Sequence, residues 1–285
     1  MENLLIVDGH NLLFQMFFGM PSRIINEDGK AIHGVMGFVG ALIKIIRMTK
    51  ATHIIVIFDG EHENDRVELL PEYKANRVDY SGVPDDECPF SQLDDIYNAL
   101  DFMKIKHIEA TEFEADDIIA NYVYEYSGDM KIFISSFDSD FFQLISDTVS
   151  TLRYRGKNTV VCDTAYIQDK YGILPEQYVD FKSLTGDNAD NIKGAEKIGL
   201  KTAALLVNQF GNLQGIINNA DKITKPSIKE SVLRNKERLQ MNHKLIKLDN
   251  KQVQILDLCD LIYTNTNIST HEVLRGIKLL KERTL

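Results

Sequence analysis

Residues 131–145 read KIFISSFDSDFFQLI, and this stretch decides the fold that we predict. Its first part, Ile132–Ile134, is a short apolar run rich in β-branched residues, which predicts a buried strand. Small and acidic residues follow, and a helix-like pattern resumes at Phe141. Open parallel sheets bind ligands beyond the carboxyl ends of their strands. Asp138 and Asp140, two apart on an extended chain, point to the same side of such an end.

These two carboxylates would repel each other by roughly 4 kcal/mol at a separation of ~4 Å and an effective dielectric of ~20. A cation between Asp138 and Asp140 would remove that repulsion. An ordinary acidic loop is the alternative for this stretch taken alone. The other strands of the chain bear on the choice.

Two more apolar runs end in an Asp-Gly pair, so an acidic residue again follows a predicted buried strand. Leu4–Val7 is followed by Asp8, and Thr52–Phe58 is followed by Asp59. Asp8 has an alternative role as the N-cap of the next helix. Further short strands are expected at 105–108 and 159–162, with amphipathic helices between the strands. This alternation predicts an α/β fold with a central, mostly parallel sheet flanked by helices.

A polar insertion at about 61–104 separates the second and third strands. Long insertions of this kind are usually functional. Within it, Tyr73, Lys74 and Arg77 stand close together. On a helix, Lys74 and Arg77 would share a face and could clamp a phosphate, with Tyr73 free to stack on a base. A solvated surface helix is the alternative.

The alternation of strands and helices stops after residue 162. We therefore predict an α/β domain over 1–163 and a helical region over 164–285. Asp187 and Asp190, three residues apart, are expected to share a helical face. A glycine-bounded hairpin over 184–206 would expose backbone N–H groups beside Lys193, Lys197 and Lys201, which favours an anion site. A plain packing unit of two helices is the alternative.

Composition fits a globular protein, with 285 residues, 44% hydrophobic and 26% charged. No apolar run approaches the ~20 residues that span a bilayer, the N-terminus resembles no signal peptide, and three scattered cysteines suit a reducing cytoplasm. We expect a cytoplasmic protein without membrane contact. A net charge of −10 argues against nucleic acid. That argument weakens if divalent cations neutralise a converging set of acids.

Such a set exists at strand ends and helix starts. Three acids within residues 114–117 exceed what the helix dipole, at ~0.3–1 kcal/mol each, would require. The converging carboxylates are Asp8, Asp59, Glu114, Asp116, Asp138, Asp140, Asp187 and Asp190. Hard oxygen ligands favour Mg²⁺ or Mn²⁺. More carboxylates than one ion needs indicate a two-metal site, whose natural substrate is a phosphodiester.

The chain resembles the 5′-3′ exonuclease or flap endonuclease family, which includes the N-terminal nuclease domain of bacterial DNA polymerase I and stand-alone bacterial relatives. The motifs that carry the resemblance are 114–117 (EADD), 138–144 (DSDFFQL), 186–192 (GDNADNI) and 73–77 (YKANR). The resemblance implies a PIN-like or resolvase-like nuclease domain, a helical arch over the site, and a helix-hairpin-helix (helix-three-turn-helix) DNA-binding region.

The resemblance also implies roles for residues. One metal would be held by Asp59, Glu114, Asp116 and Asp138, and the second, more loosely, by Asp140, Asp187, Asp190 and Asp8, with Asp117 in an outer position. Lys74 and Arg77 would act in catalysis by positioning the scissile phosphate, and Tyr73 would stack on the unpaired end. Duplex DNA would contact Lys193, Gly194, Lys197, Gly199, Lys201 and Thr202. K⁺ would bind backbone carbonyls between Ile192 and Ile198. In this chain Lys197 replaces a glycine common in the family.

The implied function is a structure-specific 5′-nuclease, a monomer that cleaves DNA at 5′ ends and 5′ flaps in replication and repair by a two-metal mechanism. Three alternative functions fit the sequence less well. A phosphatase with Asp8 as its nucleophile requires an acid two residues later, where this chain has His10. An inactive DNA-binding relative would lack a metal ligand, and here the set of ligands is complete. A small PIN-like ribonuclease would lack the hairpin that this chain has.

Overall fold

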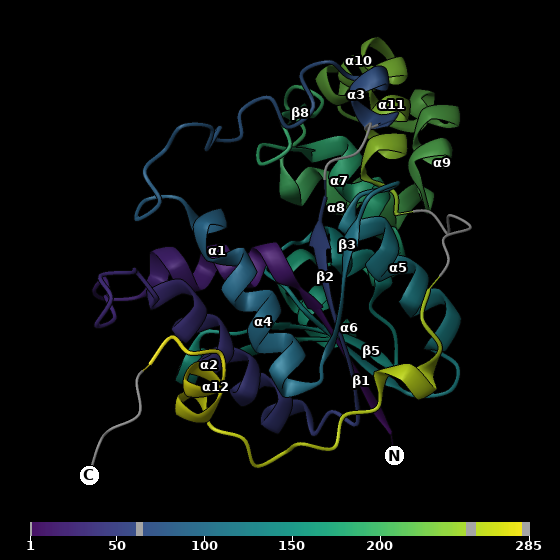
Figure 1. Ribbon diagram of the computed structural model, residues 1–285. Helices are drawn as coiled ribbons and strands as arrows, with labels where there is room; N and C mark the ends of the chain where they lie inside the picture. The colour runs from purple at the N-terminus through teal and green to yellow at the C-terminus, as the bar shows by residue number, and fades with distance from the viewer. Residues whose placement is uncertain (1, 61–64, 249–254, 281–285) are drawn as a thin grey trace.

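The computed structural model describes residues 2–60, 65–248 and 255–280, and places an α/β domain beneath a helical region (Figure 1). In this part of the chain, six strands form the central sheet, and all neighbouring pairs are parallel except β5 and β6. The predicted fold class is confirmed. In sheet order the strands are β3 (Lys106–Ala110), β2 (His53–Asp59), β1 (Asn3–Asp8), β4 (Lys131–Ser135), β5 (Val149–Arg153) and β6 (Val160–Cys162).

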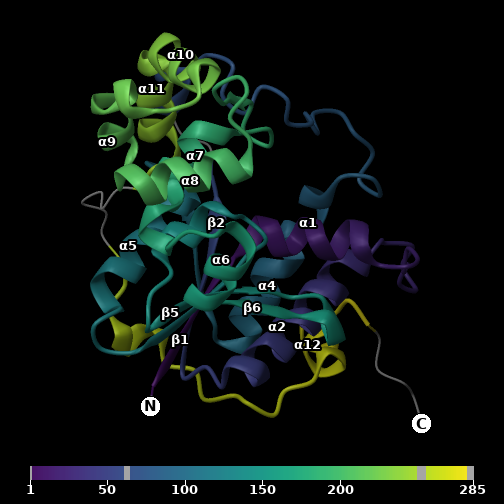
Figure 2. The same ribbon diagram turned by 180° about the vertical axis from the view of Figure 1, so that it is seen from behind.

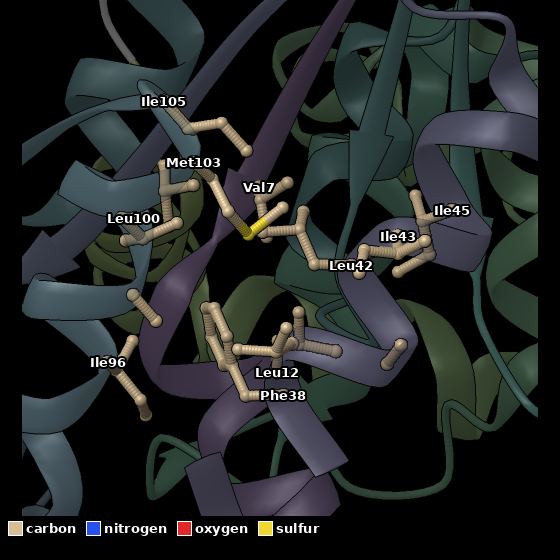
Figure 3. Close-up of a cluster of buried hydrophobic side chains, with 14 of the residues drawn as sticks. Val7, Leu12, Phe38, Leu42, Ile43, Ile45, Ile96, Leu100, Met103 and Ile105 are labelled. Atoms are coloured by element: carbon tan, nitrogen blue, oxygen red, sulfur yellow. The ribbon is translucent and has the colours of Figure 1, made fainter. Parts of the chain in front are cut away.

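Helices cover both faces of the sheet, which is why its central strands are apolar throughout. Successive side chains of β1 point to opposite faces: Leu5 and Val7 enter one core, and Leu4 and Ile6 enter the other. Figure 3 shows side chains of the first core, among them Val7, Leu12 and Phe38. The helices of this core are α1 (Gly9–Gly19), α2 (His33–Thr49), α4 (Leu93–Met103) and α12 (Thr270–Gly276); α5 (Ala115–Tyr126) covers the other face.

The helical region has its own core, which Phe142, Ile145 and Cys162 of the sheet domain join. Figure 2, from behind, shows α6 next to the sheet and α9, α10 and α11 farthest from it. The elements are α6 (Thr164–Tyr171), α7 (Tyr178–Thr185), β7 (Gly186–Asp187), β8 (Ile192–Lys193), α8 (Leu200–Phe210), α9 (Leu213–Asn218), α10 (Pro226–Arg234) and α11 (Lys236–Ile246). None of the described helices is long and apolar enough to cross a membrane.

The arch insertion is less helical than predicted. Residues 61–64, where we placed its start, lie outside the described residues. From there α3 (Asp65–Leu69) packs beside α11, and turns and loops follow as far as a short 3-10 helix at Pro89–Gln92. The predicted helix through Lys74 and Arg77 is wrong, because Lys74 has a φ of +56°, a left-handed conformation that ends a right-handed helix.

Two other local predictions need correction. Asp187 and Asp190 do not share a helical face: Asp187 ends the short strand β7, and Asp190 lies in the turn that leads to β8. The turn requires a φ of +58° at Asn191. Strand β5 was not predicted, because its sequence VSTLR is short and half polar. The edge strand near residue 160 is confirmed as β6.

Candidate metal centre

The acidic residues of the α/β domain gather where the strand order reverses. Asp8 ends β1, Asp59 ends the neighbouring β2, and Asp138 follows β4 on the other side of β1. This switch point is the place where open α/β sheets bind ligands. The common edge predicted for these three side chains is therefore present.

Asp8 is both a helix cap and a member of this cluster. Its Oδ1 accepts a hydrogen bond from the backbone N–H of Asn11 at 3.0 Å, and its Oδ2 accepts one from Ser136 Oγ at 2.8 Å. Burial, with smaller contributions from the nearby Asp59 and Asp138 carboxylates, raises the pKa of Asp8 to about 7. A cation beside this buried carboxyl group would stabilise its ionised form and lower its pKa.

The start of α5 adds two further acids to this group. Asp59 Oδ1 accepts a hydrogen bond from the backbone N–H of Ala115 at 2.8 Å, which ties the end of β2 to the first turn of α5. Glu114 is the N-cap residue, yet its side chain caps no backbone group of the helix. Burial, and then the negative charge of Asp138, raise the pKa of Asp116 well above its usual value.

A second group of acids adjoins the first. Asp140, Asp187 and Asp190 each place a carboxylate oxygen within 4.8 Å of the others. Burial raises the pKa of Asp140 to about 7, although the Lys182 ammonium opposes the shift. Asp138 connects the two groups, because its Oδ1 accepts the Asp140 N–H at 2.8 Å and its charge also raises the pKa of Asp8 and Asp116.

Lysine and arginine side chains enter the carboxylate groups. Lys74 Nζ lies 2.7 Å from Glu114 Oε1, and Arg77 Nη2 lies 3.2 Å from Asp190 Oδ1. Lys182 of α7 forms ion pairs with Asp140 and, at 2.5 Å, with Asp187. Both basic residues predicted from the arch are thus brought to the acids, although not by a helix.

Lys182 and Arg66 were not found by sequence reasoning. Lys182 lies in a largely apolar stretch of α7, YVDFKSLT, and a lysine there was a usable signal. Arg66 lies in a polar run that gives no such signal. It binds both oxygens of Asp117, at 2.9 and 3.0 Å, and Asp117 is 1% exposed. Asp117 therefore faces an arginine rather than the two carboxylate groups.

Tyr73 is not free to stack on a base, contrary to the prediction. It is 5% exposed, packs against Val179 and Ile192, and donates a hydrogen bond from its hydroxyl to Glu114 Oε2 at 3.3 Å. Other aromatic rings lie at the base of the arch. Phe14 contacts Phe18, Tyr80 and Phe90 with ring centroids 5.3–6.0 Å apart, and Phe18 is 59% exposed.

The hairpin exposes its lysines. Lys193, Lys197 and Lys201 all face solvent, and Lys197 has a φ of +67°, a conformation that suits the glycine it replaces. At Gly194 a side chain would meet the backbone of Thr185, since an added Cβ would lie 2.4 Å from its carbonyl oxygen.

The remaining predicted hairpin residues lie around these lysines. Gly199 is the N-cap residue of α8, and Thr202 lies in the first turn of that helix. The side chains of Ile192 and Ile198 are buried.

The donor set fits hard divalent cations. It consists of carboxylate oxygens in two adjoining groups, which is the ligand chemistry of Mg²⁺ or Mn²⁺ rather than of a thiolate metal site. Buried carboxylates of raised pKa, now offset by lysine and arginine, would ionise fully beside such ions.

Comparisons with known proteins agree with this geometry. Residues 3–172 match the family model of the 5′-3′ exonuclease N-terminal resolvase-like domain, and residues 173–268 match that of the 5′-3′ exonuclease C-terminal SAM fold. The chain is 35% identical over 258 residues to a 5′-3′ exonuclease of Buchnera aphidicola, covering 86% of each. It is 31% identical over 245 residues to the thermostable DNA polymerase I of Thermus aquaticus, covering 86% of this chain but 28% of that protein.

Solved structures show the same fold. T5 5′-exonuclease with zinc ions bound superposes with a TM-score of 0.70 and 26% identity, covering 87% of this chain and 90% of that one. The bacteriophage T5 flap endonuclease in a complex with DNA and metal ions gives a TM-score of 0.70 at 25% identity, covering 87% and 89%. The chain therefore belongs to the 5′-3′ exonuclease family.

Proposed function

We propose that this chain is a structure-specific 5′-nuclease that hydrolyses phosphodiester bonds of DNA at 5′ ends and 5′ flaps, in replication and repair, with two divalent ions, Mg²⁺ or Mn²⁺. The observation that carries the proposal is the pair of adjoining carboxylate groups that share Asp138. Membership of the 5′-3′ exonuclease family supports it.

We propose one set of ligands for each ion. Two ions so held would polarise the scissile phosphate and lower the pKa of an attacking water. The first ion would bind the acids at the end of β2, after β4 and at the start of α5. The second would bind Asp140 and the hairpin acids and, more loosely, the acid at the end of β1. The first set is Asp59, Glu114, Asp116 and Asp138, and the second is Asp8, Asp140, Asp187 and Asp190.

Lys74 and Arg77 act by exchanging partners. Each now holds a carboxylate, Glu114 and Asp190 respectively, that belongs to a proposed metal group. When the carboxylates bind ions, the two basic groups become available to the scissile phosphate. There they offset the charge that develops on the phosphoryl oxygens. Asp117 stays with Arg66 and serves as an outer support.

The helical region provides the duplex contacts. Lys193, Lys197 and Lys201 extend from the hairpin and the start of α8, where exposed N–H groups favour phosphate. Gly194, Gly199 and Thr202 allow the backbone to approach, and carbonyls between Ile192 and Ile198 would hold K⁺ against the duplex. Such contacts read the shape of DNA rather than its sequence.

The unpaired 5′ strand needs a different partner from Tyr73. Aromatic rings bind single-stranded nucleic acid by stacking on its bases. In this proposal the rings around Phe14 at the base of the arch, of which Phe18 is the most exposed, stack on the unpaired bases in place of the buried Tyr73.

Further elements of the proposal concern the whole molecule. We propose that the chain acts as a cytoplasmic monomer with DNA as its partner, and that its functional division lies at residues 163–164. The T5 flap endonuclease, which has been seen with DNA and metal ions, supports DNA as the partner.

A labelled duplex with a 5′ flap tests the proposal directly. Cleavage is expected with Mg²⁺ or Mn²⁺ and is expected to stop with a chelator. Asp59→Ala and Asp138→Ala should each abolish cleavage while the protein still binds the flap. Cleavage without metal, or binding by the unchanged protein without cleavage, would refute the proposal and favour a phosphatase or an inactive DNA-binding protein.

A further inference from the structure

One buried guanidinium joins three segments that are far apart in the sequence. Arg66 begins the arch in α3, and its side chain is 9% exposed. Its Nη1 and Nη2 bind both oxygens of Asp117, and Nη1 also donates to Glu114. Its Nε donates to the carbonyl oxygen of Leu245 at 3.0 Å. The arch, the acidic start of α5 and the end of α11 therefore meet at one side chain.

Each of these contacts uses a property that arginine has and lysine lacks. Glu114 and Asp117 are three apart at the start of α5, so their carboxylates lie on the same side of it. A planar fork can bind Asp117 at two points and still reach Glu114. Leu245 lies in the last turn of α11, where carbonyl groups have no partner within the helix and the helix dipole favours a cation.

The two oxygens of Glu114 have different surroundings. Oε2 is held by Arg66 and by the hydroxyl of Tyr73, both of which are buried. Oε1 faces Lys74. Buried partners on one oxygen thus fix the direction of the other. That second oxygen is the one that lies beside an exchangeable ammonium group.

We infer that Arg66 is a positioning residue that aims Glu114 Oε1 at the metal centre and fixes the start of the arch to α11. The inference rests on the proposed function, because it takes Glu114 as a metal ligand. Groups that orient metal ligands in this way typically change metal affinity by about 10–100-fold when they are mutated. A guanidinium that only compensated buried charge would contribute to folding and leave metal affinity unchanged.

Two variants separate these roles. Arg66→Lys keeps the positive charge but removes the fork. The double variant Arg66→Gln/Asp117→Asn removes one charge of each sign and replaces the pair by neutral side chains of similar shape. Arg234→Lys is the matched control, since Arg234 is an exposed arginine that pairs with Glu196 outside the metal centre.

The readouts are Mn²⁺ binding to the DNA-free full chain, by calorimetry and by the Mn²⁺ paramagnetic resonance spectrum, and thermal unfolding with and without Mn²⁺. We expect Mn²⁺ affinity to fall at least about tenfold in both Arg66 variants, and to stay unchanged in Arg234→Lys. Faster hydrogen exchange over 65–77 should accompany the loss.

The outcomes are distinct. If either Arg66 variant binds Mn²⁺ as tightly as the unchanged protein, the positioning role is overturned. If the unchanged protein itself binds no Mn²⁺, the proposed two-metal function fails instead. If the double variant should prove unfolded, the result for Arg66→Lys decides, because that variant retains the compensating charge.

Discussion

Replacing Lys182 with methionine should reveal competition between a lysine and a metal ion for the same carboxylates. The Lys182 ammonium is buried and pairs with Asp140 and Asp187, which belong to the proposed second metal group. Methionine has a similar length and no charge. In Lys182→Met, Asp140 and Asp187 would face each other without the ammonium that now pairs with both.

The expected loss in the free energy of unfolding follows from the burial of this ion pair. Removing one partner of a buried ion pair typically lowers the free energy of unfolding by ~3–5 kcal/mol, because the remaining charge stays uncompensated. A divalent ion at about 100 times its dissociation constant adds ~2.7 kcal/mol to any folded state that binds it. In the variant the ion has no ammonium to displace. Metal should therefore stabilise Lys182→Met more than it stabilises the unchanged protein.

Urea unfolding with and without MgCl₂ measures both the free energy of unfolding lost on substitution and the free energy gained on metal binding. Lys170→Met is the control, because Lys170 is an exposed lysine of α6 that donates to Tyr166 away from the carboxylate groups. We expect a large loss for Lys182→Met without metal and a partial recovery with it. An equal loss under both conditions, or a loss no greater than that of Lys170→Met, would refute the competition.

Three other predictions concern pH, the hairpin and the aromatic rings. Burial raises the pKa of Asp8 and Asp140 from 3.8 to about 7, so their contribution to stability is full below pH 3.8 and is lost as pH rises through about 7. The metal-free protein should lose stability between about pH 4 and about pH 7 while Mn²⁺ affinity rises, up to about tenfold per pH unit for each carboxyl that must ionise. A metal-induced shift in Tm that stays constant over this pH range would contradict the prediction. Lys197→Gly should keep or raise stability, since it relieves ~1 kcal/mol of left-handed strain, but should reduce the salt dependence of duplex binding by about one charge. Lys104→Gly, at another left-handed lysine, should leave duplex binding as it was. Phe18→Ala should weaken binding of a single-stranded 5′ end by ~1–3 kcal/mol, measured by fluorescence anisotropy against duplex without a flap.

The strand ends could be predicted because the signal is local. An apolar run that ends at an acidic residue predicts both a strand and the edge of the sheet at which that residue lies. Neighbouring parallel strands end at the same edge. The sequence alone therefore predicts that Asp8, Asp59 and Asp138 lie at one edge of the sheet, and the structure places them there. This prediction required no knowledge of the loops between the strands.

The partners of the acids could not be predicted in the same way. Arg66 meets Asp117 across 51 positions and Leu245 across 179, and nothing near Arg66 in the sequence marks either contact. The burial of Tyr73 likewise depends on side chains from the helical region. The prediction that Asp187 and Asp190 share a helical face was wrong, because residues three apart also lie close together in a tight turn.

The shared position of Asp138 has a consequence for synthesis of the protein. A ribosome delivers Asp138 and Asp140 well before Asp187, Asp190 and the lysine that steadies them. A nascent chain halted at the end of its sheet would present the first carboxylate group and only a fragment of the second. Under the proposed two-metal function, such a chain would lack the acids that hold the second ion, and we expect it to be unable to cleave DNA until the hairpin has been translated and docked.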